Sequence, residues 1–338
     1  MRSSRGRGSV GRGPDLSTVS DRWPAMTGGI RQTCTSPEAS RRGRLGRRVN
    51  AIALLWALRP LQWTKNALIL AAVVFSGELF AAEQLVRAVA AAVIFCAVSS
   101  GVYLINDLRD VEADRLHAKK RHRPIAAGLV TPAQAMLVAA TLCLIGFVAA
   151  GQVGMSFLAI VLGYVLLMTA YSYGLKRVVI LDVFAIAAGF VLRAVAGAVA
   201  IDVPISPWLY VCTMLLALFI GFGKRRHELT SLAGEAARHR ANLDAYSVSL
   251  LDQIIGIIAA STVMVYSLYT FDAPNVPRNH AMMLTIPFVV YAILRYLYLL
   301  QRRDLGGAPE VLLFTDRPLL ACIAGWGFST VAILYLMP

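Results

Sequence analysis

The chain has 338 residues, of which 57% are hydrophobic and only 15% charged, and its formal net charge is +14. This composition is typical of a protein that crosses a membrane several times, and it excludes an ordinary soluble domain, in which about a quarter of the residues are charged. The five cysteines lack metal-ligand spacing and the five histidines do not cluster, so no zinc site is predicted.

The first 49 residues differ from the rest of the chain. They hold 11 arginines, no lysine and three acidic residues among many glycines and serines. Such a segment cannot bury enough apolar surface to fold, which predicts a disordered cytoplasmic tail over 1–49 and a membrane domain over 50–338. The segment lacks the apolar run of a signal peptide. It also lacks aromatic platforms, so we expect no nucleic-acid partner.

We expect deletion of residues 2–45 to leave turnover nearly intact. The tail is far in sequence from every polar motif described below, and the apolar segments alone anchor the chain in the bilayer. Assays of membranes that carry the truncated or the full-length chain test this. Loss of catalysis in a truncated chain that still folds would contradict it.

Nine apolar segments of about 20 residues, the length that crosses a bilayer, follow the tail. We therefore expect an all-α, polytopic membrane protein with spans at 60–81, 84–105, 131–150, 154–173, 179–200, 206–222, 250–271, 281–300 and 318–336. Connections rich in lysine and arginine alternate with connections that hold only Arg278. This bias predicts a cytoplasmic N-terminus, cytoplasmic basic loops and an outside C-terminus in the cell membrane.

The first polar motif, Arg59-Pro-Leu-Gln62-Trp-Thr-Lys65-Asn66, enters the first span. A tryptophan at this depth is typical of the interfacial belt. Gln62, Lys65 and Asn66, however, are too many polar groups for a turn that faces lipid. We therefore expect these three side chains to line a cavity and bind substrate.

The second motif is Asn106-Asp107-Leu-Arg-Asp110-Val-Glu-Ala-Asp114, directly after an apolar run. The three aspartates have the spacing i, i+3, i+7, which predicts that they share one helical face. Such oxygen ligands suit Mg²⁺, which binds through a few carboxylates together with substrate phosphates. The alternative is a solvated helix end whose acids pair with neighbouring arginines.

The third motif contains Tyr171 and Lys176, followed by Asp182 and Arg193 on one face of the next span. Tyrosine and lysine at a span end ordinarily anchor the helix at the interface. An arginine inside the bilayer is costly and usually faces a polar interior. For Arg193 the sequence leaves open a direct substrate contact and a structural role between buried helices.

The fourth motif, Gly221-Phe-Gly-Lys224-Arg225-Arg226, ends another span. Basic residues at this position also follow from the cytoplasmic bias of positive charge. Lysine supplies a point charge for a phosphate, and arginine supplies a fork of two donors. We therefore expect Lys224, Arg225 and Arg226 to bind substrate phosphates.

The run Asn106-Asp107-x-x-Asp110-x-x-x-Asp114 resembles the first aspartate-rich motif of the UbiA superfamily of intramembrane prenyltransferases. The resemblance covers roughly residues 50–338. It implies nine helices around a central cavity that opens to the membrane under cytoplasmic cap loops. It also implies Mg²⁺ at Asn106, Asp107, Asp110 and Asp114.

The chain departs from the aromatic prenyltransferases of the superfamily at their second motif, Asp-x-x-x-Asp. Here the second acid is replaced by an isoleucine, Ile186. The first, third and fourth motifs resemble instead a branch that transfers the phosphoribosyl group of phosphoribosyl pyrophosphate to decaprenyl phosphate for cell-wall arabinan. The resemblance implies that Lys176, with the aspartates, serves this Mg²⁺-dependent reaction.

Alternatives remain at this stage. One is an aromatic prenyltransferase of quinone or haem biosynthesis, against which the missing acid argues. Another is a transporter of an anionic lipid or metabolite, since intramembrane charge would serve that as well. A structural scaffold would not need the aspartates. Isoprenoid length and oligomeric state, a homo-oligomer included, do not follow from the sequence.

Overall fold

The computed structural model describes residues 50–117, 120–204, 206–231, 243, 245–273, 276–302, 312 and 315–337. The predicted tail over 1–49 lies outside these residues. The described part contains helices and no strand, which confirms the all-α prediction. The α-helices are α2 (Ala51–Ala57), α3 (Ala71–Phe75), α4 (Ala82–Arg109), α5 (Val111–Leu116), α6 (Pro132–Val153), α7 (Met155–Tyr173), α8 (Leu181–Ala200), α9 (Pro207–Ser231), α11 (Val248–Asp272), α12 (Ile286–Arg302) and α14 (Arg317–Leu336). The 3₁₀ helices are η3 (Pro60–Leu70), η4 (Lys120–His122), η5 (Leu175–Arg177) and η6 (Ala281–Thr285).

Eight helical segments of the described chain are long and apolar enough to cross a membrane. They match the second to ninth predicted spans. The first, predicted over 60–81, is not a continuous α-helix but η3 followed by α3. At rises of about 2.0 and 1.5 Å per residue these two pieces together extend about 30 Å, the thickness of the hydrocarbon core. The chain is therefore a multi-pass membrane protein.

Side-chain hydrogen bonds explain why η3 departs from α-helical geometry. Trp63 Nε1 donates to Ser100 Oγ on α4 at 3.0 Å, and Asn66 Nδ2 lies 3.2 Å from Cys96 Sγ on the same helix. Asn66 Oδ1 accepts from Arg193 on α8 at 2.7 Å. These tertiary bonds hold the polar turn against two neighbouring helices, so they outweigh the local preference for an α-helix.

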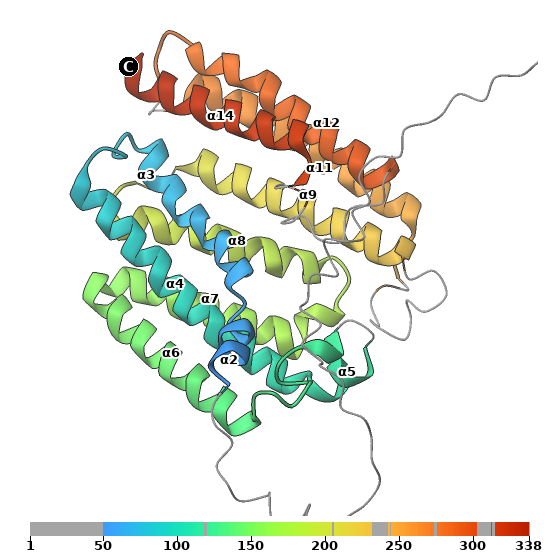
Figure 1. Cartoon of the computed structure of the whole chain (residues 1–338). Coiled ribbons are helices and arrows are strands. Elements are labelled where there is room, and N and C mark those ends of the chain that lie inside the picture. Colours follow the sequence, from blue (N-terminus) through green and yellow to red (C-terminus); the bar gives the residue numbers. More distant parts are fainter. Residues whose placement is uncertain are drawn as a thin grey trace, which may run out of the picture. The chain divides into compact units, whose positions relative to one another are not determined.

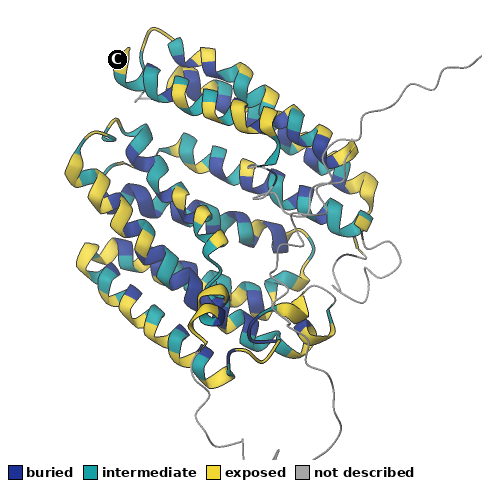
Figure 2. Cartoon of the chain, in the orientation of Figure 1, coloured by how far each residue is buried: buried dark blue, intermediate teal, exposed yellow. Residues whose placement is uncertain are grey.

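Helix α8 lies at the centre of the bundle. It packs against α7, α9 and η3, while α4 packs against α6 and η3 (Figure 1). The most apolar stretch of α8 is 61% buried, against 17% for α6, and Figure 2 shows the same contrast. Val183 and Ala187 belong to the core formed with α9, α11, α12 and α14, whereas Ala196 and Ala200 belong to the core formed with η3, α4, α6 and α7.

Gly197 on α8 permits the close approach of η3. A Cβ atom at Gly197 would lie 2.1 Å from the carbonyl oxygen of Ile69. Because a backbone atom cannot move aside cheaply, we expect Gly197→Ala to lower the free energy of unfolding by about 1–3 kcal/mol. Thermal unfolding in detergent measures this.

Gly256→Ala on α11 is the matched control, because a Cβ atom there would meet nothing within 4 Å. We expect it to be neutral or to stabilise by up to about 1 kcal/mol. Equal destabilisation by the two substitutions would contradict the close-approach argument.

One end of the bundle, here called the basic end, carries Arg109, Lys176 and Arg226 together with α5, η4 and η5. Two connections between the predicted spans, 106–130 and 223–249, are partly helical. In the first, α4 continues to Arg109 and α5 follows; in the second, α9 continues to Ser231. Lys224, Arg225 and Arg226 therefore project from a helix, which fixes their directions relative to α8 and α11.

Candidate active site at the basic end

Two of the predicted aspartates are buried and share one arginine. Asp107 on α4 and Asp114 on α5 are each 3% exposed. Arg123 Nη1 lies 3.0 Å from Asp107 Oδ1 and 2.7 Å from Asp114 Oδ2, and Arg59 also contacts Asp107. A buried carboxylate requires such partners, because an unpaired charge away from water is strongly destabilising.

The other half of the motif faces the connection between α7 and α8. Lys176 Nζ on η5 lies 3.1 and 3.2 Å from the two carboxylate oxygens of Asp110. Asn106 Oδ1 accepts a hydrogen bond from Ser172 Oγ at 2.9 Å. Asp110 is the junction of α4 and α5, with φ −91° and ψ 8°, so the helix is interrupted there. The single acidic face predicted from the spacing is therefore divided into two sides.

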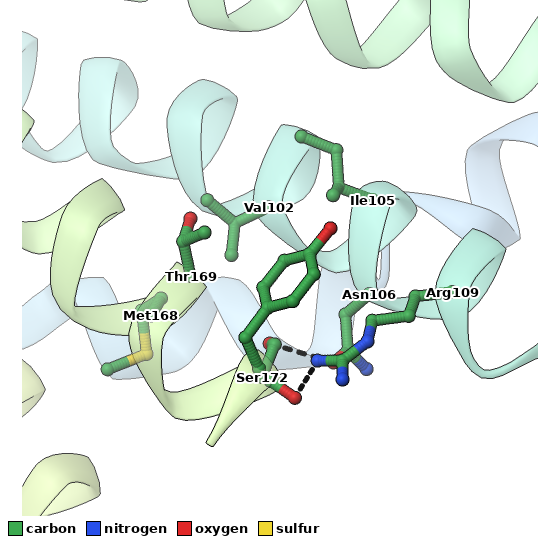
Figure 3. A pocket seen from close by; sticks show the side chains of 8 residues that line it. Val102, Ile105, Asn106, Arg109, Met168, Thr169 and Ser172 are labelled. Atoms are coloured by element: carbon green, nitrogen blue, oxygen red, sulfur yellow. Dashed lines mark hydrogen bonds between the residues drawn. The ribbon is translucent and has the colours of Figure 1, made fainter. Parts of the chain in front are cut away.

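A small pocket opens beside Asn106, between the ends of α4 and α7 (Figure 3). The Arg109 guanidinium donates to the carbonyl oxygen of Ser172 and lies 4.0 Å from the centre of the Tyr173 ring. Polar side chains of the pocket, among them Asn106 and Arg109, lie beside apolar ones such as Val102 and Met168. The lining residues of the pocket are Val102, Ile105, Asn106, Arg109, Met168, Thr169, Ser172 and Tyr173.

The predicted metal ligands are not gathered around one point in this structure. Within the described residues, no three acidic, histidine or cysteine side chains lie close enough to share one ion. The reason is that a basic side chain holds each of the three carboxylates. The donors still fit Mg²⁺, which needs only one or two carboxylates besides substrate phosphates. Oxygens of Asp107 and Asp114 already converge on one cationic nitrogen, that of Arg123.

The residues at the ends of α8 and α9 form ion pairs with each other and with α11. Asp182 is completely buried, and its Oδ2 lies 2.9 Å from Arg225 Nε, an ionic contact without hydrogen-bond alignment. Arg225 also contacts Glu228. Arg226 Nε donates to Asp252 Oδ1 on α11 at 2.6 Å. The two arginines predicted to bind phosphate therefore have acidic protein partners in this structure.

Arg193 is 4% exposed and lies deep in the bundle. Its guanidinium donates to Asn66 Oδ1 at 2.7 Å, to the Gly189 carbonyl at 2.7 Å and to Tyr164 Oη at 2.8 Å. These bonds join η3, α7 and α8. They favour the structural alternative for Arg193 and for Asn66, since an intramembrane arginine needs several polar partners.

The remaining predicted residues, Gln62, Lys65, Tyr171 and Lys224, are half-buried. Two residues that contact the aspartates, Arg59 and Arg123, were not predicted as site residues. Arg59 is the first residue of the first polar motif, and Arg123 lies nine residues after the second. Basic residues close to an acidic motif were a usable signal for both.

The chain resembles two curated relatives, both named decaprenyl-phosphate phosphoribosyltransferase. The protein of Corynebacterium glutamicum is 35% identical over 85% of this chain and 88% of its own length. The protein of Mycolicibacterium smegmatis is 36% identical over 83% of this chain and 92% of its own length.

A solved UbiA homolog from Archaeoglobus fulgidus, bound to GPP and Mg²⁺, has the same fold. Its TM-score is 0.61 at 19% sequence identity, and the match covers 83% of this chain and all of that one. The family model of the UbiA prenyltransferase family matches residues 66–316. The chain therefore belongs to the UbiA prenyltransferase family.

Proposed function

We propose that the protein transfers the 5-phosphoribosyl group of phosphoribosyl pyrophosphate to the phosphate of a polyprenyl phosphate, with decaprenyl phosphate as the natural acceptor. Two relatives named for this activity align over nearly their whole lengths. The observation that carries the proposal is the ion pair of Asp182 with Arg225. At the place of the second acidic motif of aromatic prenyltransferases, this chain has a buried carboxylate neutralised by an arginine.

The reaction requires little covalent chemistry from the protein itself. An oxygen of the acceptor phosphate forms a bond with the anomeric carbon of the ribose, and the bond from that carbon to pyrophosphate breaks. The acceptor phosphate is already an anion at neutral pH, so no general base is required. Rate enhancement then comes from positioning the two substrates and from stabilising the charge of the departing pyrophosphate.

The cations that hold the aspartates can serve this purpose. Asp107, Asp110 and Asp114 would hold Mg²⁺, with Asn106 beside them, and the bound ion would neutralise charge on the pyrophosphate. Lys176 and Arg123 lose their carboxylate partners in that state. Both are about a quarter exposed, so their side chains can turn to phosphate oxygens.

The membrane orientation belongs to the same proposal. The basic end faces the cytoplasm, which supplies the soluble donor, and the C-terminus lies outside. The hydrocarbon chain of the acceptor stays in the bilayer, and its phosphate reaches the aspartates at the membrane surface.

The 5-phosphate of the donor requires a cation of its own. Lys224 is our candidate among the three residues of that motif, because its half-buried side chain carries the point charge that suits a phosphate. We expect Lys224→Ala to reduce kcat/KM for phosphoribosyl pyrophosphate by about 10- to 100-fold, the effect of losing one hydrogen bond to a charged group. Steady-state kinetics in detergent or nanodiscs measure this.

The control is Arg278→Ala, which removes an exposed charge at the opposite end of the bundle. We expect it to leave kcat/KM unchanged. Equal losses in the two variants would count against a role for Lys224 in donor binding.

The proposal is tested by product analysis with the purified full-length chain. One reaction contains radiolabelled phosphoribosyl pyrophosphate and decaprenyl phosphate, and we expect a labelled lipid that releases ribose 5-phosphate on mild acid treatment. A second reaction contains a prenyl diphosphate and an aromatic acid, and we expect no product. Turnover in the second reaction alone would assign the chain to the aromatic prenyltransferases instead.

A further inference from the structure

A strained turn connects η5 to α8. Ile180 has φ 69° and ψ −50°, and the Leu181 amide donates to the Val179 carbonyl at 2.8 Å across it. Positive φ is a marked outlier for a β-branched residue, because Cβ crowds the following carbonyl. Such a conformation costs about 1–3 kcal/mol and persists only where surrounding contacts hold it in place.

Tyr246, from the connection between α9 and α11, supplies those contacts. Its Oη accepts a hydrogen bond from the Ile180 amide at 2.6 Å and donates one to Asp182 Oδ1 at 3.2 Å. The residue is 4% exposed. Burial, the largest influence, raises the pKa of Tyr246 to about 12, so the hydroxyl keeps its proton and can donate to the carboxylate.

The turn lies close to the candidate site along the chain. Lys176, whose Nζ contacts Asp110, precedes Ile180 by four residues in the same short connection. On the other side of the turn, Asp182 is fixed by Arg225. The hydroxyl of Tyr246 therefore bonds to both sides of the turn, at Ile180 and at Asp182, and this turn ends the short connection that carries Lys176.

We propose that Tyr246 is a positioning residue of the phosphoribosyl transfer, which holds the turn at Ile180 so that Lys176 stays aligned with the aspartates. The inference rests on the proposed function and extends it to a residue outside all four sequence motifs. Tyr246 touches neither substrate. It acts through the backbone of the connection between α7 and α8.

The experiment combines Tyr246→Phe with Ile180→Gly. Tyr246→Phe removes only the hydroxyl, and we expect it to raise KM for phosphoribosyl pyrophosphate about tenfold, on the scale of a small misplacement of a binding group. Ile180→Gly alone should be close to the wild type, since glycine adopts positive φ readily. In the double variant the relaxed strain should restore most of the lost affinity.

Tyr335→Phe is the matched control, because its hydroxyl bonds to backbone groups of Val73, Val74 and Leu79 at the other end of the bundle. We expect it to lower the unfolding temperature as much as Tyr246→Phe and to leave KM unchanged. An unchanged KM in Tyr246→Phe, or no recovery in a folded double variant, would overturn the proposal.

Hydrogen–deuterium exchange separates this inference from the proposed function. Backbone amides of residues 178–182 should exchange faster in Tyr246→Phe than in the wild type, whatever the substrate. If the wild type does not use phosphoribosyl pyrophosphate, the proposed function fails while this measurement still decides whether Tyr246 holds the turn. Unaltered exchange would refute the holding role itself.

Discussion

Asp110→Asn is expected to reduce turnover at least about a hundredfold, the scale for loss of a key electrostatic group. Asp110 is the most exposed of the three aspartates, with 28% of its side chain accessible and Lys176 opposite. Asparagine keeps the shape but removes the charge that would hold Mg²⁺ and orient the lysine. Because the site is open to solvent here, we expect little change in the unfolding temperature.

Asp107→Asn and Asp114→Asn should lower turnover by at least as much and should also destabilise the fold. Both carboxylates are buried against Arg123, so each substitution removes a charged partner of this arginine and leaves a neutral amide in a buried ionic cluster. The control is Asp202→Asn, an 82% exposed partner of Arg87, which should change neither property.

Removal of metal by EDTA should abolish turnover and Mg²⁺ should restore it. Full activity without metal would contradict the ion-binding role.

The second large effect is expected at the pair of Asp182 and Arg225. Asp182→Leu should lower the free energy of unfolding by about 3–5 kcal/mol, because the buried guanidinium of Arg225 keeps Glu228 but loses its buried carboxylate partner. Arg225→Met should have a similar effect for the opposite reason. The two side chains are 0% and 3% exposed, so water cannot replace the missing partner. Thermal unfolding in detergent measures each loss.

The double variant Asp182→Leu/Arg225→Met should recover most of the stability, because removal of both charges also removes the desolvation penalty. Asp252→Leu is the matched control. It breaks the ion pair between Asp252 and Arg226, which lies on the same helix as Arg225. Because Asp252 is 34% exposed, the substitution should lower the free energy of unfolding by less than about 1 kcal/mol. A double variant no more stable than either single variant would refute a mutual pairing.

The spans from 84 onward were predictable, because a run of some 20 apolar residues has few other stable environments. The helical end of α9 was not predictable, because the segment from Lys224 to Ser231 is polar, which is typical of a loop. Its helical form depends on the contacts of Arg225 with α8 and of Arg226 with α11. Such contacts join residues far apart in sequence, which local patterns do not encode.

The candidate site was predictable in its residue types but not in its pairings. Spacing identified Asp107, Asp110 and Asp114, yet it could not reveal that α4 ends between them and directs their side chains to different partners. The alternative expected a solvated helix end with neighbouring arginines, whereas Asp107 and Asp114 are buried and pair with arginines from elsewhere in the chain. Arg59 and Arg123 approach from 48 and 16 residues away.

The network of Arg193 has a consequence for how the protein is made. Arg193, the partner of Asn66, is synthesised 127 residues later in the chain. At synthesis rates of about 5–20 residues per second, the delay is about 6–25 s. During that interval η3 carries its polar groups without Arg193, and its close neighbour Gly197 is also still missing. Helix η3 thus reaches its final place only after α8 has been inserted.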